Sequence, residues 1–340
     1  MTLAFTEKAQ MSLRRPELQK SNTAATQALL QCQQRDGHWV FELEADATIP
    51  AEYVLLRHFR GEPIDKELER KIASYLRRIQ GPHGGWALFH EGAFDMSASV
   101  KAYFGLKMTG ESPDAPHMRR AREAILSRGG AVHSNVFTRA LLSLYGILDW
   151  RSVPEMPVEI VLLPSWFPFH LSKVSYWART VLVPLLVLQA LRPRAKNPLG
   201  VRIDELFVEP PATIGPVPKA PHQRWSWFLF FRGIDAVLRP AVKLFPKSLR
   251  QRAINKAVEF VTERLNGQDG LGAIFPAMGN ATLMYDVLGD KANAATARDS
   301  IDGLLVIHDH EAYCQPCVSP VWDTALTCHA LLEMGGDDAR

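Results

Sequence analysis

The sequence predicts an all-α fold of paired helices, and two observations carry that prediction. Apolar residues recur with the period of a helix: in residues 68–79 they fall at Leu68, Ile72, Tyr75, Leu76 and Ile79, which is one face of a helix. Residues 136–147 and 253–265 repeat this pattern. A template of Leu, Gln, Gly and Trp also occurs twice, and alternating strand patterns are scarce.

The repeated template reads Leu-x3-Gln-x3-Gly-x-Trp, and its two copies are 47 residues apart from Trp39 to Trp86. A repeat of this length is typical of helical pairs. We expect the Gln to bond free carbonyl or amide groups at a helix end, the Gly to allow a turn and the Trp to be buried with its N–H satisfied. We therefore interpret these residues as scaffold: Leu29, Gln33, Gly37 and Trp39, then Leu76, Gln80, Gly84 and Trp86.

Composition excludes several classes of protein. With 47% hydrophobic residues over a length of 340, the chain has enough apolar mass to fold. A net charge of +3 gives no support for nucleic-acid binding. Four cysteines are too few for a disulfide framework, which favours a reducing compartment. No signal peptide and no apolar stretch of about 18 residues is found, so we expect an intracellular protein that does not span a membrane.

A basic and aromatic segment, residues 222–252, follows a proline-rich stretch. Between Lys219 and Arg252 the chain has eight Lys or Arg residues and one acid, Asp235. Dense aromatic residues among cations favour contact with a membrane surface, and a buried aromatic helix with a solvated basic rim is the alternative. The residues expected to contact the membrane are Trp225, Trp227, Phe228 and Phe231, and the prolines before them are Pro193, Pro198, Pro210, Pro211, Pro216, Pro218 and Pro221.

Several motifs together resemble the squalene–hopene cyclases, which are triterpene cyclases of α/α-barrel architecture. They are the two Gln–Gly–Trp repeats, SNVFTRALLSLYG, SYWARTVLVPLLVL, GLGAIFPAM and above all CQPCVSPVWDTAL. The resemblance covers the chain from about Ala24 to Leu332. It implies cyclisation of squalene to hopene or hopanol through protonation and a carbocation cascade. It implies no metal or organic cofactor.

The family's architecture has two barrels, one of them inserted into the sequence of the other. By resemblance, residues 29–315 form the inserted barrel, whereas residues 1–28 and 316–340 belong to the catalytic barrel. The family's proton-donor Asp motif lies beyond Arg340, and Asp337 and Asp338 do not match it. The resemblance therefore implies that this chain is the N-terminal half of a cyclase, inactive alone, with apolar surface exposed on both flanks.

Residues of this chain that match family positions are expected to line the substrate pocket, where aromatic faces stabilise passing positive charge. Phe275 and Asn135 depart from residues found in some relatives, and we expect Asp323 to cap the helix that follows it. The matching pocket residues are Trp322, Trp177, Phe137, Ile274 and Pro276, and Val174 and Leu182 match residues that narrow the access channel.

Two other functions stay open at this point. One is a non-enzymatic, membrane-associated remnant that binds apolar ligands or partners. The other is zinc-dependent prenyl transfer. The sequence has only one Cys-x-x-Cys pair for it, and the residues of suitable ligand type are Cys314, Cys317, His308, His310, Cys328 and His329. For the cyclase, the expected partners are squalene, a membrane surface and a second copy in a homodimer, with no nucleic acid. The expected location is peripheral, on the cytoplasmic side of the membrane.

Overall fold

The computed structural model describes residues 2–220, 223–267 and 269–335, with side chains from residue 16 onward. Pro221, Asp337 and Asp338 lie outside the described residues. The chain divides into two compact units, Met1–Leu43 with Val318–Arg340 and Glu44–Cys317.

The first unit pairs helix α1 (Thr2–Gln31) with helix α12 (Pro320–Met334), which contact each other. Ser319, not Asp323, is the N-cap residue of α12, so the expected capping role of Asp323 is wrong. Asp323 lies in the first turn and accepts a hydrogen bond from the backbone N–H of Phe41 at 2.9 Å. The neighbouring hydroxyl of Thr324 accepts from the N–H of Trp39 at 2.9 Å, and the segment after α1 is thereby tied to α12.

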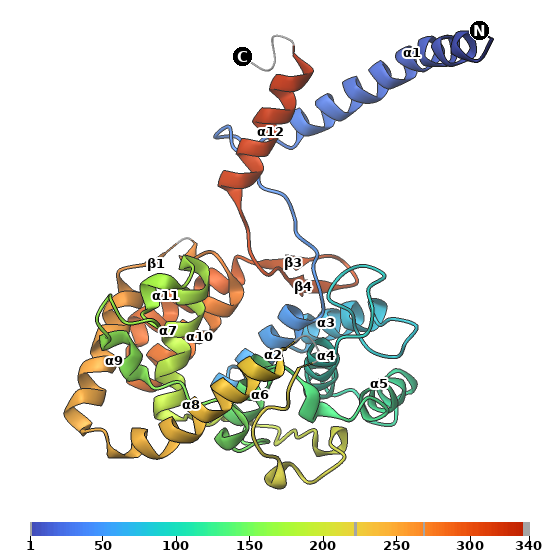
Figure 1. Ribbon diagram of the computed structural model, residues 1–340. Coiled ribbons are helices and arrows are strands. Elements are labelled where there is room, and N and C mark those ends of the chain that lie inside the picture. Colours follow the sequence, from blue (N-terminus) through green and yellow to red (C-terminus); the bar gives the residue numbers. More distant parts are fainter. Residues whose placement is uncertain (1, 221–222, 268, 336–340) are drawn as a thin grey trace. The chain divides into compact units, whose positions relative to one another are not determined.

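The second unit consists of inner and outer helices packed in pairs (Figure 1), in keeping with the all-α class that the sequence predicted. In the inner ring α2 contacts α4, α4 contacts α6, α7 contacts α10, and α10 returns to contact α2. α6 and α7 complete the wall, because both line the same central cavity. The inner helices are α2 (Thr48–Arg60), α4 (Met96–Met108), α6 (Val136–Leu144), α7 (Tyr176–Leu191) and α10 (Phe275–Leu288).

Each outer helix packs one apolar face against the inner ring and leaves its charged face in solvent. α3 is the clearest case: it buries Ile72, Tyr75 and Leu76, whereas the inner helix α4 is buried around nearly its whole circumference. The outer helices are α3 (Lys66–Arg78), α5 (Pro116–Leu126), α9 (Lys247–Thr262) and α11 (Lys291–Asp302).

Two predicted helices are shorter than their apolar patterns. α6 ends at Leu144, because Gly146 has a φ of 66° and turns the chain. α9 ends at Thr262, and Leu265 instead pairs with Leu271 in an antiparallel hairpin. The strands are β1 (Leu265–Asn266) with β2 (Gly270–Leu271), and β3 (Leu305–Ile307) with β4 (Ala312–Cys314).

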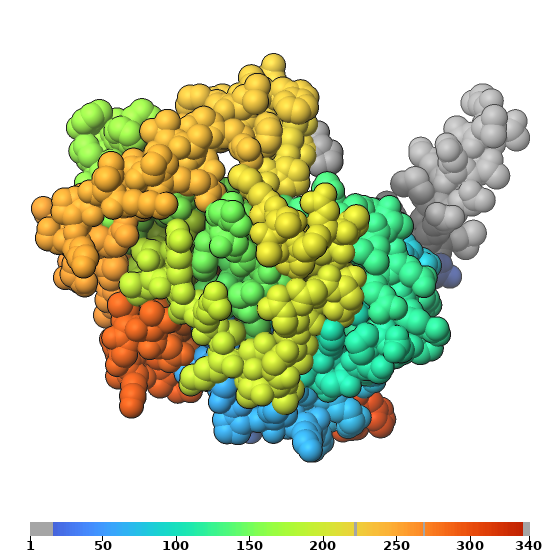
Figure 2. Space-filling model, turned by 90° about the horizontal axis from the view of Figure 1, so that it is seen from below, coloured from blue at the N-terminus to red at the C-terminus, as the bar shows by residue number. Residues whose placement is uncertain are grey.

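Long connections within the second unit contain single turns of 3₁₀ helix and one further long helix, α8 (Trp225–Leu244). Figure 2 shows this gold-coloured segment standing out from the body of the unit. The short turns are η1 (Ala131–His133), η2 (Trp150–Ser152), η3 (Val158–Leu162), η4 (Leu171–Lys173), η5 (Asp204–Leu206) and η6 (Pro211–Thr213).

Both copies of the Gln–Gly–Trp template form the same hydrogen bonds. The indole N–H of Trp39 donates to the Leu29 carbonyl at 2.7 Å, and that of Trp86 donates to the Leu76 carbonyl at 2.8 Å. Both rings are buried. The template therefore closes a loop of ten residues with a buried indole, which confirms its interpretation as scaffold.

The Gln side chains of the two copies differ in reach. Gln33 donates only to the carbonyl of Gly37, at 2.9 Å and at the surface. Gln80 donates to Gly84 at 2.7 Å and to the His117 carbonyl of α5 at 2.9 Å, and accepts from Arg120. Only the second copy, then, uses its Gln to join consecutive helices.

We predict that Gln80→Leu lowers the free energy of unfolding by about 1–3 kcal/mol, because it leaves carbonyls of Gly84 and His117 without this donor. Gln33→Leu is the matched control and should cost less than about 1 kcal/mol, since its single bond is exposed to water. Urea unfolding followed by circular dichroism measures both. Equal effects of the two substitutions would contradict this account of the repeat.

Candidate functional site

An apolar cavity of about 370 Å³ lies inside the ring of inner helices. All five inner helices contribute to its wall, and most of the lining side chains are aliphatic or aromatic. Such a lining suits a hydrocarbon ligand, because it offers dispersion contacts and few groups that need water. The apolar lining residues are Ile49, Leu55, Leu56, Phe59, Phe137, Ala140, Leu141, Leu144, Val181, Leu185, Phe275, Pro276, Gly279 and Leu283.

The structure brings two of the predicted pocket residues together in this cavity. Phe137 is on the first turn of α6, and Pro276 is on the first turn of α10. Proline suits this position, because its missing N–H would have no partner in a first helical turn. The ring of Phe137 remains 49% exposed, so one of its faces is open. Phe275, beside Pro276, is buried and also lines the cavity.

The remaining predicted pocket residues are not in the lining of this cavity. Ile274 immediately precedes α10 and pairs through its backbone with Cys317. Trp177 is on the first turn of α7, with its ring against Gly272 and 53% of the residue exposed. Trp322 is on α12 of the first unit and is 65% exposed.

The two predicted channel residues flank Trp177 in the chain. Val174 follows the short helix η4 and Leu182 is on α7, and both are half-buried. Val181, next to Leu182 on α7, lines the cavity. Its carbonyl accepts a hydrogen bond from the side-chain amide of Asn280 on α10 at 3.1 Å.

An ion pair between Glu52 of α2 and Lys101 of α4 forms part of the cavity wall. Lys101 is only 7% exposed, so this pair is largely withdrawn from water and removal of one partner would leave a costly unpaired charge. The sequence did not predict this pair, because both segments carry further charged residues: Glu52 shares α2 with two arginines, and Lys101 shares α4 with Lys107.

Arg139 holds the outer side of α6 in place. Its guanidinium is fully buried and donates to the carbonyls of Ser152 at 2.9 Å and Gly215 at 3.2 Å. Burial lowers the pKa of Arg139 to about 10, because no carboxylate compensates the charge. These bonds fix two long connections behind α6, the helix that presents Phe137 to the cavity.

The aromatic side chains of α8 are at the surface. Trp225 is 65% exposed, Trp227 58% and Phe231 51%, whereas Phe228 is half-buried. No residue of α8 is buried, so the alternative of a buried aromatic helix is wrong. Trp166, on the connection before α7, is exposed as well and was missed by sequence analysis.

The described part of the chain contains no helix that combines the length and the hydropathy needed to cross a membrane. Within the same residues, no three His, Cys, Asp or Glu side chains are grouped as metal ligands. Cys314 is buried, and burial raises the pKa of its thiol. A neutral, enclosed thiol is a poor ligand for zinc and a poor nucleophile.

A family model described as the squalene-hopene cyclase N-terminal domain matches residues 23–310. The chain belongs to the squalene–hopene cyclase family. Its helical ring is the arrangement expected of that family's α/α barrels. The match covers the inner helices, the cavity and α8.

Curated relatives agree with this assignment. The chain is similar to the squalene–hopene cyclase of Bradyrhizobium diazoefficiens, with 66% identity over 325 residues, 95% of this chain and 49% of the relative. It is 58% identical to that of Zymomonas mobilis, over 93% of this chain and 49% of the relative. It is 31% identical to that of Alicyclobacillus acidocaldarius, over 96% of this chain and 51% of the relative. The chain thus spans about half the length of the curated relatives it matches.

We predict that Gly279→Leu weakens binding of an apolar fluorescent probe by about tenfold, because the added side chain occupies the cavity. Gly279 is helical, and a Cβ there meets only the edge of Phe275 at 3.8 Å, so the backbone tolerates a side chain. Fluorescence titration with 1-N-phenylnaphthylamine measures the change.

Gly279→Ala is the control for this prediction and should bind the probe within about twofold of the parent chain, since a methyl group takes little of the cavity. Equal probe affinity in Gly279→Leu and the parent, with both proteins folded, would show that the probe binds elsewhere.

Proposed function

We propose that this chain supplies the N-terminal part of a squalene–hopene cyclase and that its cavity takes part in holding the polyene substrate. The observation that carries the proposal is the shared position of Phe137 and Pro276 on one apolar cavity enclosed by the inner helices. Two family-matched residues from distant parts of the chain meet there. The identity to cyclases over almost the whole chain supports the same proposal.

The chemistry proposed for the complete enzyme begins with protonation of one end of squalene by a carboxylic acid. Carbocations then pass along the folded chain as rings close, and loss of a proton or capture of water ends the cascade. Residues of this chain act on that sequence by shape and by electron-rich faces. We assign a cation-stabilising role to Phe137, Trp177 and Trp322, because an aromatic face attracts a desolvated cation by about 2 kcal/mol or more.

The exposure of Trp177 and Trp322 is consistent with this assignment. An indole that lines a chamber shared with another part of an enzyme is open to solvent when that part is not there to cover it. α12 also exposes Val321, Leu326 and Leu332 beside Trp322. We propose that further chain, carrying the proton donor, packs on this apolar face of α12 and that the 340-residue chain alone does not cyclise squalene.

We also propose that α8 contacts a membrane surface and thereby gives the enzyme access to a substrate that is insoluble in water. Its exposed indole rings suit the headgroup region, and the cations of the same helix suit anionic lipid. Trp166, on the connection before α7, is a further exposed indole of the same unit. A peripheral position on the cytoplasmic side and a homodimer rest on the resemblance alone.

We predict that the chain alone forms no hopene or hopanol, whereas its fusion to the second half of the Bradyrhizobium diazoefficiens relative restores product. The physical reason is that the fusion supplies both the acid and the surface that covers α12. Incubation with squalene in detergent, followed by gas chromatography, measures product. The second half alone is the control, and product from the 340-residue chain by itself would refute the proposal.

A second prediction concerns α8: replacing Trp225, Trp227 and Phe231 by Ser weakens binding to phosphatidylcholine vesicles by at least about tenfold, because three rings no longer enter the interface. Vesicle sedimentation measures bound protein. The control replaces Val208, an exposed apolar residue outside α8, by Ser. Unchanged sedimentation of the triple variant would rule out membrane contact through α8.

A further inference from the structure

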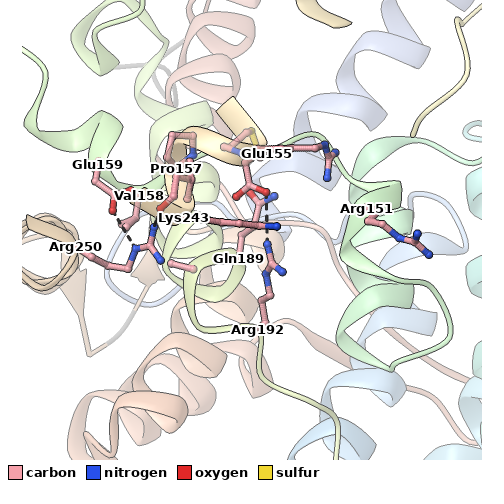
Figure 3. A pocket seen from close by; sticks show the side chains of 13 residues that line it. Arg151, Glu155, Pro157, Val158, Glu159, Gln189, Arg192, Lys243 and Arg250 are labelled. Atoms are coloured by element: carbon pink, nitrogen blue, oxygen red, sulfur yellow. Dashed lines mark hydrogen bonds and ion pairs between the residues drawn. The ribbon is translucent and has the colours of Figure 1, made fainter. Parts of the chain in front are cut away.

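A second cavity, of about 500 Å³, lies in the same unit and is separate from the apolar one. It lies where the C-terminal ends of α7 and α8 meet η3 and the start of α9, and Figure 3 shows the side chains that line it. Five cationic side chains and two carboxylates line it. The charged residues are Arg151, Arg192, Arg239, Lys243 and Arg250, with Glu155 and Glu159.

Two of the arginines are fixed as parts of the wall. Arg250 donates from Nε to the Glu159 carboxylate at 3.0 Å and from Nη2 to the Val242 carbonyl at 3.0 Å. Arg239 donates to Asp235 at 2.7 Å and to the Val153 carbonyl at 2.6 Å. Their charges are largely compensated, and their hydrogen bonds hold α8 and α9 against the connection before η3.

The other three cations are exposed. Arg151 is paired with Asp149 at 3.1 Å, outside the lining. Arg192 reaches Glu155 through one nitrogen at 3.5 Å, and half of its side chain is exposed, so most of its N–H donors remain available. Lys243 is exposed and forms no salt bridge with a described residue. Figure 3 shows its side chain reaching across the cavity.

The charge balance favours an anion. Glu159 is matched by Arg250, Glu155 by Arg192, Arg239 by Asp235 and Arg151 by Asp149, which leaves the ammonium of Lys243 in excess. A tetrahedral anion could accept from Lys243 and from the spare donors of Arg192 together. Guanidinium and ammonium groups are the usual partners of phosphate.

The position of the cavity points to the source of that phosphate. Lys243 and Arg239 are on α8, the helix whose exposed rings are proposed to enter the membrane interface. A helix that lies in the interface has its whole length near the headgroups. The cavity at its C-terminal end would then open at the depth of lipid phosphates.

We propose that this cavity binds the phosphate of an anionic phospholipid headgroup, with Lys243 and Arg192 as its principal donors. This inference rests on the proposed membrane contact of α8 and adds a lipid class to it. It assigns separate roles to the two ends of α8: the aromatic end enters the interface without regard to lipid charge, and the cationic end selects anionic lipid.

The test compares binding to vesicles of phosphatidylcholine alone with binding to vesicles that contain phosphatidylglycerol. Removing the charge of Lys243 or Arg192, by Lys243→Gln or Arg192→Gln, should reduce the extra affinity for phosphatidylglycerol vesicles by about fivefold each, the effect of one charge near an anionic surface. Lys243→Arg should retain it. Binding to phosphatidylcholine alone should not change in any of these variants.

Lys256→Gln is the matched control, because it also removes one exposed cation, from α9, but outside this cavity. If Lys256→Gln and Lys243→Gln lose the same amount of affinity for phosphatidylglycerol vesicles, general surface charge explains the effect and the assignment is wrong. No loss in Lys243→Gln and Arg192→Gln would overturn it as well. In both cases a normal response of the α8 aromatic variants would leave the membrane proposal standing.

Inorganic phosphate, at constant ionic strength, distinguishes a free anion from a lipid. If phosphate raises the melting temperature of the parent chain but not of Lys243→Gln, while phosphatidylglycerol binding is the same in both, the cavity takes a soluble phosphate and the lipid assignment is wrong. Loss of phosphatidylglycerol selectivity in Lys243→Gln supports the lipid assignment.

Discussion

The contact between α2 and α10 is the constraint on which the rest of the structure depends. α2 and α10 are more than 200 residues apart in the chain, yet they pack against each other and complete a wall that α4, α6 and α7 continue. The apolar faces of these helices are buried against one another. Because these helices surround one space, Phe137 at the start of α6 and Pro276 at the start of α10 share one cavity, and Glu52 and Lys101 form their ion pair in its wall.

The scaffold around this ring is stabilised by hydrogen bonds that water does not reach easily. The Trp–Leu bond of the repeated template closes a loop in each unit, and in the second unit Gln80 extends it to the next helix. Arg139 does similar work for the long connections behind α6. The apolar surface that remains open is concentrated on α12 and α8, and we attribute the first to a further part of a cyclase and the second to a membrane.

The sequence alone predicted the helical class and the buried Trp–Gly turns well, because helical periodicity and fixed spacing are local properties. It also predicted the exposed rings of α8 from their density among cations. It did not predict where α6 and α9 end, since a left-handed Gly146 and the pairing of Leu265 with Leu271 decide those boundaries. The Glu52–Lys101 pair and the cationic cavity of Lys243 were missed, because each joins helices that only the tertiary fold brings together.

Photoaffinity labelling tests most directly whether the cavity inside the ring binds a polyene. A squalene analogue carrying a diazirine at one end would be irradiated with the full chain, and the labelled peptides identified by mass spectrometry. Our account predicts labels within α6 and the first turns of α10, lost when excess squalene competes. Labels confined to α8 or α12, with α6 and α10 unmodified, would contradict it.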